Sequence, residues 1–344
     1  MNRLRVAIET QFARGTPTGL GVYAKALTKA LAARSDVDVV ELHDPRFDVW
    51  RFDRRVYWDQ IRAPQLAAAA RVQVVHFTGG TLPLHPPHPC VLTVHDMAWL
   101  HGVVEGRSYS RMYFGTLQRR LARRADVIAT DTAVVRDEIL SLLQLPHSQV
   151  TVCGCGVDSS WFDIQRRVSE PPYLLCVGTV EERKDLITVV RALVQLPSVR
   201  LVSAGPHTGY AARVRAAAEA AGVGERLTLH GFVDDARLRA LYSGAVALIF
   251  PSRYEGFGLP ALQALAAGIP VIASDLPVLR EVLGDWALFA PPGDAHVFAE
   301  CARSIMEGGA SVEAQTRGGR AHAKRMQWPQ VADRMVQLYR SVAA

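Results

Sequence analysis

Short apolar runs alternate with longer amphipathic segments along the whole chain. The runs are rich in Val, Ile and Leu and carry few polar residues, as expected for parallel strands that are buried on both faces. The segments between them place apolar residues at helical spacing, so the pattern predicts repeated strand–helix–strand units. The predicted strands lie at 4–8, 37–42, 72–77, 90–94, 127–130 and 150–153, and then at 173–179, 200–205, 227–229, 231–233 and 247–250.

The strands fall into two series, which predict an α/β protein of two doubly wound, Rossmann-like domains facing across a cleft. Serines and a proline pair indicate a linker over 156–172. We therefore expect an N-terminal domain over 1–160 and a C-terminal domain over 161–327. A final amphipathic helix is predicted over 328–344.

Composition supports this size and limits the compartment. The 344 residues are 49% hydrophobic, which fits two α/β domains better than one. No apolar run approaches the roughly 18 residues of a membrane span, and the N-terminus lacks a signal-peptide core, so we expect a cytoplasmic protein. The five cysteines lie mostly in apolar runs and are expected to be buried thiols rather than zinc ligands.

The net charge of +6 and the isoelectric point near 9.2 favour anionic partners, such as nucleotides, lipid head groups or nucleic acid. Nucleic acid is the least favoured of these, because the positive charge is dispersed and no recognition module is present. A loop that carries His85 and His88 among prolines lacks clustered acidic or cysteine partners. We interpret it as a solvent-facing loop rather than a metal site.

The most informative stretch is 251–274. It follows an apolar run and contains a glycine loop and then a proline suited to the first turn of a short helix. Leu259, the expected N-cap, has no side-chain acceptor, so the free N–H groups of the helix start suit a phosphate-bearing ligand. Glu255 on the loop and Gln263 in the helix are expected to face that ligand. An ordinary strand–loop–helix corner explains the same glycine spacing.

Three further loops follow predicted strands and carry reactive or flexible groups. Gly19 and Gly21 precede a helical pattern, a frame that either holds a diphosphate or only frees the backbone. Arg183 and Lys184 open another helix, where two cations neutralise a diphosphate or form solvated surface. His95 ends a strand, at the edge of the sheet where ligands of open α/β folds bind, although a structural histidine is the alternative.

The string over 254–260, with the run over 268–272 after it, closely resembles the retaining family-four glycosyltransferases, which have the GT-B fold. Those enzymes carry two glutamates separated by seven residues in this stretch. The first position here is Glu255, but the second is Gln263. The resemblance covers essentially the whole chain and is strongest over 173–294. It implies that the final helix packs back on the N-terminal domain.

The resemblance also implies roles for individual residues. Glu255 would orient the transferred sugar, and His95 would contact it from the other domain. Arg183 and Lys184 would neutralise the leaving diphosphate, and Gln263 would face the ribose. No metal ligand is implied, and no cofactor besides the nucleotide sugar. The other donor-binding residues implied are Gly19 and Gly21 at the diphosphate, Phe232 and Val233 at the base, and Gly178, Gly256, Phe257, Gly258 and Leu259 around the donor.

By this resemblance the reaction moves a hexose, with retention and without a metal, from a nucleoside-diphosphate sugar to a glycan or lipid-linked glycan acceptor. Similarity to mannosyl- and rhamnosyltransferases around 177–179 and 95–96 favours a GDP-sugar, with UDP-sugars next. Two alternatives stay open. One is a non-catalytic protein that binds a nucleotide sugar, which only Gln263 favours. The other is a nucleotide-sugar epimerase on the same fold, which releases sugar and diphosphate without an acceptor.

Two segments of the N-terminal domain are candidates for a membrane surface. Aromatic residues are mixed with arginines over 47–58, and the helical pattern over 108–124 has one basic face. Some relatives use such a basic helix to meet anionic membranes or lipid-linked acceptors, which implies peripheral contact at the cytoplasmic face of the membrane. A partly buried loop and a solvated basic face are the alternatives. The basic face consists of Arg119, Arg120, Arg123 and Arg124.

Overall fold

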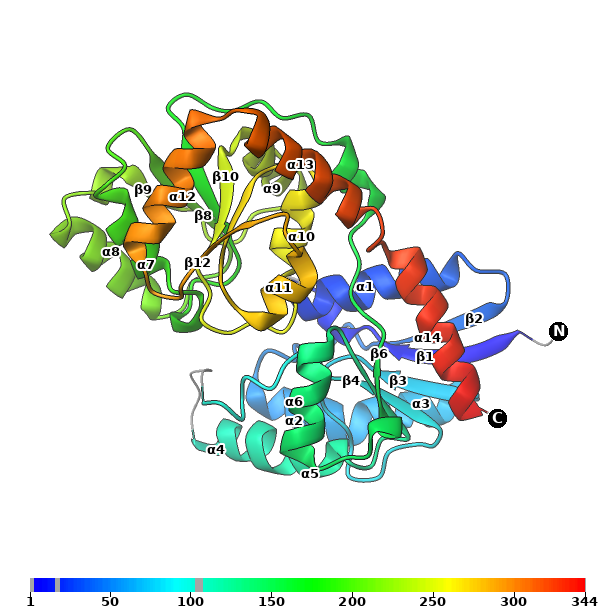
Figure 1. The fold of residues 1–344 in the computed structure, drawn as a ribbon. Coiled ribbons are helices and arrows are strands. Elements are labelled where there is room, and N and C mark those ends of the chain that lie inside the picture. Colours follow the sequence, from blue (N-terminus) through cyan, green and yellow to red (C-terminus); the bar gives the residue numbers. More distant parts are fainter. Residues whose placement is uncertain (1–2, 16–18, 103–107, 344) are drawn as a thin grey trace. The chain divides into compact units, whose positions relative to one another are not determined.

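The computed structural model describes residues 3–15, 19–102 and 108–343, which form two compact α/β units (Figure 1). Unit 1 comprises Met1–Gly156 together with Trp328–Ala344, and unit 2 comprises Val157–Gln327. The boundary therefore falls four residues before the one expected from the sequence. The α/β class and the two doubly wound sheets are confirmed.

Unit 1 contains, among its described residues, a six-stranded parallel sheet in the order β2-β1-β3-β4-β5-β6. The inner strands β3, β4 and β5 are buried along their whole length, which explains why the sequence shows them as apolar runs. The strands are β1 (Leu4–Glu9), β2 (Val37–Leu42), β3 (Val74–Phe77), β4 (Cys90–Thr93), β5 (Val127–Thr130) and β6 (Val150–Val152). The α-helices are α1 (Gly19–Ala32), α2 (Phe52–Tyr57), α3 (Ala63–Ala70), α4 (Ser108–Arg111), α5 (Gln118–Ala122), α6 (Ala133–Leu143) and α14 (Trp328–Ala343).

Unit 2 has the same architecture, with a six-stranded parallel sheet in the order β12-β11-β10-β7-β8-β9 among its described residues. The strands are β7 (Tyr173–Val177), β8 (Arg200–Ala204), β9 (Leu227–Leu229), β10 (Ala247–Phe250), β11 (Val271–Ser274) and β12 (Leu288–Ala290). The α-helices are α7 (Leu186–Leu193), α8 (Tyr210–Ala220), α9 (Asp235–Gly244), α10 (Leu259–Ala266), α11 (Pro277–Leu283), α12 (Ala295–Glu307) and α13 (Ala310–Ala323).

Several element predictions need correction. The segment 108–124 is interrupted by a π-helical stretch, η3 (Met112–Leu117), between α4 and α5, so its residues do not keep one helical spacing. Residues 231–233 form a loop rather than a strand, and neither β11 nor β12 was among the predicted strands. The helix after the glycines begins at Gly19, three residues earlier than the helical pattern.

Most of the predicted linker over 156–172 is instead an integral part of unit 2. It begins with the 3-10 turn η5 (Ser159–Asp163). Trp161 is 4% exposed and its ring lies 4.8 Å from that of Tyr242 in an edge-to-face contact. Arg166 donates a hydrogen bond to the Val246 carbonyl at the start of β10. These contacts fix the segment against its own unit.

The last helix, α14, belongs to unit 1 and packs against α1 and β3 (Figure 1). Its apolar face, including Val331, Met335 and Tyr339, is fully buried. Arg340 on the exposed side pairs with Asp36 at 2.7 Å. None of the helices in the described ranges combines the length and the apolar content that crossing a membrane requires.

Candidate functional site

The strand order of unit 2 reverses between β7 and β10, because β8 and β9 extend the sheet on one side and β11 and β12 on the other. β7 and β10 are parallel neighbours, so their carboxyl ends meet at one edge of the sheet. Such a reversal point is where open α/β sheets bind ligands. The loop after β7 leads to Arg183 and Lys184, and the loop after β10 carries Glu255.

Glu255 lies close to both cations, although it is 71 and 72 positions away from Lys184 and Arg183 along the chain. The Lys184 ammonium contacts Oε1 of Glu255, and Arg183 Nη1 lies 3.6 Å from Oε2 of the same carboxylate. Lys184 and Glu255 are each 8% exposed. Burial alone raises the pKa of Glu255, but Lys184 and then Arg183 outweigh it, so the pKa lies below its usual range. The carboxylate is therefore ionised and shared between two cations.

The backbone around these charges is held in unusual conformations. Gly178 at the end of β7 has φ +133°, and a Cβ there would meet the Lys184 side chain at 3.7 Å. The turn η6 (Glu182–Lys184) ends at Asp185, which has φ 46° and accepts a hydrogen bond from Arg253 Nε at 2.8 Å. The Arg253 amide also donates to the Arg183 carbonyl at 2.7 Å. The loops after β7 and β10 are thus joined to each other through Arg253.

The helix α10 begins beside this cluster with no side-chain cap. Its N-cap is Gly258 rather than the expected Leu259, which is the first helical residue. Gly258 has φ 92°, and a Cβ there would lie 2.7 Å from the Leu279 side chain, so only glycine fits. Pro260 has no N–H, and the amides of Ala261 and Leu262 donate to the Gly258 carbonyl. The helix dipole still favours a negative charge at this uncapped start.

The other residues of unit 2 that the sequence predicted to contact the donor differ in their exposure. Gln263 is partly exposed on the second turn of α10, and Phe232 is 50% exposed beside the partly exposed Val233 in the loop after β9. Phe257, by contrast, is 7% exposed. Its side chain belongs to the hydrophobic core, so of this residue only the backbone lies on the loop. Gly256 is buried as well.

In unit 1, Gly19 and Gly21 form the first turn of α1 rather than a loop before it. Thr18, directly before them in the sequence, lies outside the described residues. Gly19 is exposed and Gly21 is buried. A glycine at the start of a helix lets another molecule approach the backbone N–H groups.

His95 follows β4, and its imidazole pairs with a residue that sequence analysis missed. His95 Nδ1 lies 2.6 Å from Oδ2 of Asp131, which follows the neighbouring strand β5. The Asp131 side chain is 3% exposed and that of His95 is 17% exposed. Burial lowers the pKa of His95, but Asp131 raises it further, so the net pKa lies above the usual value. The available signal was a polar residue directly after a buried strand.

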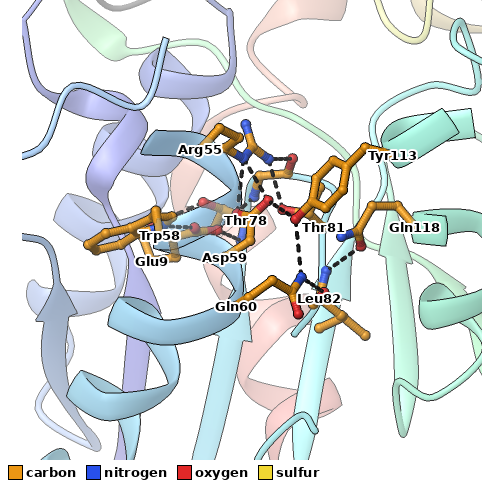
Figure 2. Close-up of polar contacts among 11 residues, drawn as sticks. Glu9, Arg55, Trp58, Asp59, Gln60, Thr78, Thr81, Leu82, Tyr113 and Gln118 are labelled. Atoms are coloured by element: carbon orange, nitrogen blue, oxygen red, sulfur yellow. Dashed lines mark hydrogen bonds and ion pairs between the residues drawn. The ribbon is translucent and has the colours of Figure 1, made fainter. Parts of the chain in front are cut away.

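A second buried polar cluster lies where the strand order of unit 1 reverses, between β1 and β3. Figure 2 shows that it is built around Glu9, the last residue of β1. Its carboxylate accepts hydrogen bonds from Trp58 Nε1 at 2.6 Å and from the backbone amides of Thr78 and Gly79 at 3.1 and 3.0 Å. The loop that follows β3 is therefore tied to the end of β1.

The same cluster continues through an ion pair (Figure 2). Arg55 Nε lies 2.9 Å from Asp59, and the guanidinium also donates to Gly79 O and Thr81 Oγ1. Tyr113 donates its hydroxyl to Asp59 at 2.8 Å. Burial, and next the Asp59 charge, raise the pKa of Glu9 to about 7. The pattern over 47–58 indicated arginines and aromatic residues in this region, but it did not indicate that Glu9 and Asp59 bind them.

One group of histidine, cysteine and aspartate side chains in the described residues has ligand atoms close enough for a metal ion. It consists of His88, Cys90 and Asp126, whose ligand atoms lie within 4.8 Å of one another. Cys90 begins β4, at the opposite end of that strand from His95. The Asp126 oxygen already accepts hydrogen bonds from the Cys90 amide and His88 Nδ1, both at 2.7 Å. Burial, the larger cause, raises the pKa of the Cys90 thiol to about 12. The expectation that the His88 loop lacks acidic and cysteine partners is therefore wrong, and the hydrogen bonds of Asp126 account for the close approach of the three side chains.

Taken together, the groups at the β7/β10 edge suit a doubly charged phosphate ester. Two cations, which pair with Glu255 and Glu181, and the uncapped start of α10 favour a negatively charged group there. The Glu255 carboxylate in the same cluster can accept hydrogen bonds from hydroxyl groups. A phosphate has no such groups when ionised, whereas a sugar carries several. The arrangement therefore fits a ligand that joins a phosphate to a sugar.

Comparison with known proteins agrees with this chemistry. The description "Glycosyltransferase Family 4" matches residues 17–161, and "Glycosyl transferases group 1" matches residues 158–322. The chain is 29% identical over 250 residues to the O-antigen chain mannosyltransferase RfbU of Salmonella typhimurium, an alignment that covers 72% of this chain and 69% of that protein.

Two further similarities extend the comparison. A glycogen synthase of Mycobacterium tuberculosis is 30% identical over 267 residues, which cover 73% of this chain and 63% of that one. The structure of sucrose-phosphate synthase from Thermosynechococcus elongatus superposes with a TM-score of 0.76 at 20% identity, over 98% of this chain and 99% of the other. The latter is a likeness of fold, and it extends over both units.

Proposed function

Because this chain belongs to the group 1 glycosyltransferases of family 4 and has their GT-B fold, we propose that it transfers a hexose with retention from a nucleoside-diphosphate sugar. The observation that carries the proposal is the buried contact of Glu255 with Lys184 and Arg183 beside the uncapped start of α10. That cluster supplies both a diphosphate site and a sugar-hydroxyl acceptor.

In this proposal, different residues of unit 2 bind different parts of the donor. Arg183 and Lys184 bind the diphosphate and stabilise the negative charge that grows on it as the glycosidic bond breaks. Glu255, held in place by both cations, accepts hydrogen bonds from hydroxyls of the sugar. Gln263, one turn into α10, binds the ribose, and Phe232 and Val233 lie against the base. In front-face retention the departing phosphate takes the acceptor proton, so the proposal requires no separate base and no metal.

The names of two relatives support a choice of donor sugar. RfbU is named as an O-antigen chain mannosyltransferase, and the O-antigen chain mannosyltransferase B of Escherichia coli is 28% identical over 63% of this chain. We therefore favour a mannose-type donor, GDP-linked before UDP-linked, and a glycan or lipid-linked glycan as acceptor. His95 of unit 1 is the proposed contact of that unit with the transferred sugar.

Transfer is expected to proceed from GDP-mannose in the presence of EDTA, and the product is expected to keep the α-configuration of the donor. The physical reason is that Arg183, Lys184 and the α10 dipole supply the positive charge that a metal would otherwise bring. The protein is incubated with a panel of GDP- and UDP-sugars and sugar acceptors, and the anomeric proton of the product is followed by NMR. A β-product, or activity lost in EDTA and restored by Mg²⁺ or Mn²⁺, contradicts the proposal.

Gln263→Ala, assayed in the same mixtures, tests the proposed contact with the ribose. Loss of one hydrogen bond to the ribose weakens the nucleoside diphosphate and the intact donor alike, by about 1 kcal/mol, with little change in turnover at saturation. Gln263→Glu, which restores the second acceptor oxygen, binds at least as tightly as the native protein. Alanine that binds as tightly as glutamine shows that position 263 does not touch the nucleotide.

We also propose that unit 1 contacts an anionic membrane, where lipid-linked acceptors are found. Arg119, Arg120, Arg123 and Arg124 are all exposed. The neighbouring elements α2 and α4, whose Phe52 and Tyr109 rings lie 4.6 Å apart, lead into exposed apolar side chains. Basic and apolar groups side by side are typical of interfacial surfaces. The exposed apolar residues are Trp50, Tyr57, Ile61, Tyr109 and Met112.

Vesicle sedimentation tests this surface. The protein is expected to bind vesicles that contain phosphatidylglycerol and to be released as salt screens the arginines. Arg119→Gln with Arg120→Gln weakens binding, whereas the control Arg213→Gln, an exposed arginine of unit 2, does not. Equal sedimentation with neutral and anionic vesicles contradicts the proposal.

A further inference from the structure

The pair formed by His95 and Asp131, at the carboxyl ends of β4 and β5, was not expected from the sequence. The two residues follow β4 and β5, which are paired in parallel, so their side chains start from the same edge of the sheet. The distance of 2.6 Å between His95 Nδ1 and Asp131 Oδ2 is that of a charge-assisted hydrogen bond. Asp131 Oδ1 has no hydrogen-bond partner among the described residues. The Asp131 carboxylate therefore binds the imidazole through Oδ2 alone.

The imidazole is also fixed on its other sides. The Tyr23 ring of α1 meets it edge-to-face, with centroids 4.5 Å apart. Nε2 is enclosed and has no hydrogen-bond partner in the described part of the chain, although the Thr78 backbone lies near enough to favour the charged ring. The strand below is anchored by Thr93 Oγ1, which lies 2.6 Å from Nε2 of His76. A ring held in this way has one orientation.

The charge of the ring depends on every titratable group around it. Asp131 and Asp96 favour the imidazolium. His76 opposes it but stays neutral, because burial and next the charge of His95 lower the pKa of His76 to about 3. Tyr23 is neutral, since burial, before Asp131, raises its pKa well above the usual value. The groups near Asp131 itself are the buried thiols of Cys153 and Cys155, whose pKa values burial raises, together with Tyr339 and Arg334.

From this geometry we propose that Asp131 is a positioning residue that holds His95 as a fixed imidazolium against the transferred sugar. This inference rests on the proposed function, in which His95 contacts that sugar. The positive charge is spread over the ring, so its exposed edge presents it even though Nε2 is enclosed. A cation fixed before the reaction attracts the electronegative oxygens of the sugar hydroxyls without reorganisation.

The raised pKa of His95 agrees with that role. Burial alone lowers the pKa of a histidine, and here the nearby carboxylates more than reverse that effect. Asparagine at position 131 keeps an oxygen acceptor for Nδ1–H but removes the negative charge. Asp131→Asn therefore separates the orientation of the ring from its protonation.

The test compares native protein and Asp131→Asn in two measurements. NMR titration of ¹³C-labelled histidine, with His95 assigned from His95→Gln, is expected to show the His95 pKa falling by about 1–3 units in the variant. Turnover at saturating donor is then expected to fall about tenfold per unit of pKa lost at alkaline pH, and to converge with the native value at acidic pH. The donor KM changes little. Asp137→Asn, which removes an exposed carboxylate of α6, shifts neither measurement.

The outcomes separate the inference from the proposed function. A native protein that transfers no sugar contradicts the proposed function, while the titration still reports on the pair. A native His95 pKa at or below about 6.5 overturns the inference, and this needs no variant to fold. Transfer by Asp131→Asn with the native pH profile also overturns it. A uniform loss of turnover at every pH shows a structural role only and overturns it as well.

Discussion

Lys184→Ala and Arg183→Ala are each expected to raise the barrier to glycosyl transfer by about 2–4 kcal/mol, and to weaken binding of the intact donor much less. The negative charge on the diphosphate grows only as the glycosidic bond breaks, so the cations matter most in the transition state. Single-turnover rates at saturating donor, set beside calorimetric binding of the donor, measure the two effects separately. Unchanged turnover in both variants, with the fold intact, would exclude the assignment.

Lys184 also stabilises the fold, and this effect has to be measured separately from its effect on glycosyl transfer. It neutralises a carboxylate that is 8% exposed, and a buried charge left without its partner destabilises a protein by about 3–5 kcal/mol. The double variant Lys184→Ala with Glu255→Gln removes both charges and is expected to recover stability but not transfer. Arg191→Ala, an exposed position at the end of α7, controls for loss of positive charge alone.

The free energy of unfolding is expected to fall by up to about 3 kcal/mol as the pH rises from about 5 to about 8, through Glu9 alone. The pKa of Glu9 is raised from 4.5 to about 7 in the folded protein, so between these values the folded state holds a proton that the unfolded state has lost. That contribution is complete below the unfolded pKa and disappears as the pH passes the folded one. Urea unfolding of native protein and Glu9→Gln across this range measures it as a difference.

The contacts of Glu9 make this a demanding test. Trp58 Nε1 and the amides of Thr78 and Gly79 all donate to the carboxylate, which favours its ionised form. If they dominate, the difference between native protein and Glu9→Gln is constant with pH, and the prediction is wrong. Glu41→Gln, an exposed glutamate on β2, is the matched control and is expected to add no pH dependence of this size.

The sequence predicted the strands well because these sheets are parallel and covered on both sides, which leaves each inner strand apolar. β11 is fully buried but was not predicted, because its four residues directly follow Gly268 and Pro270 and were assigned to the glycine-containing stretch. β12 escaped because it is short and only Ala290, at its end, is fully buried. The π-helical stretch at Met112–Leu117 escaped for another reason. It contains the same residue types as an α-helix and differs only in its hydrogen-bond ladder.

The candidate site could be predicted only in part. Glu255 and Lys184 each follow a predicted strand, but their contact depends on β7 and β10 being neighbours, which the order of elements along the chain does not state. Asp131 had no motif around it, and its function comes entirely from the pairing of β4 with β5. The region 156–172 was misjudged because proline content indicates an extended backbone, whereas Trp161 shows that an extended backbone can still be packed.

The return of α14 to unit 1 sets an order of events during synthesis on the ribosome. Unit 2 is one continuous segment, Val157–Gln327, so all its residues are synthesised before the first residue of α14. Until α14 emerges, α1 and β3 lack their cover, and His76 lacks the Tyr339 hydroxyl that lies 2.7 Å from its Nδ1. Unit 1, although its synthesis begins first, is thus completed only after all of unit 2 has been synthesised.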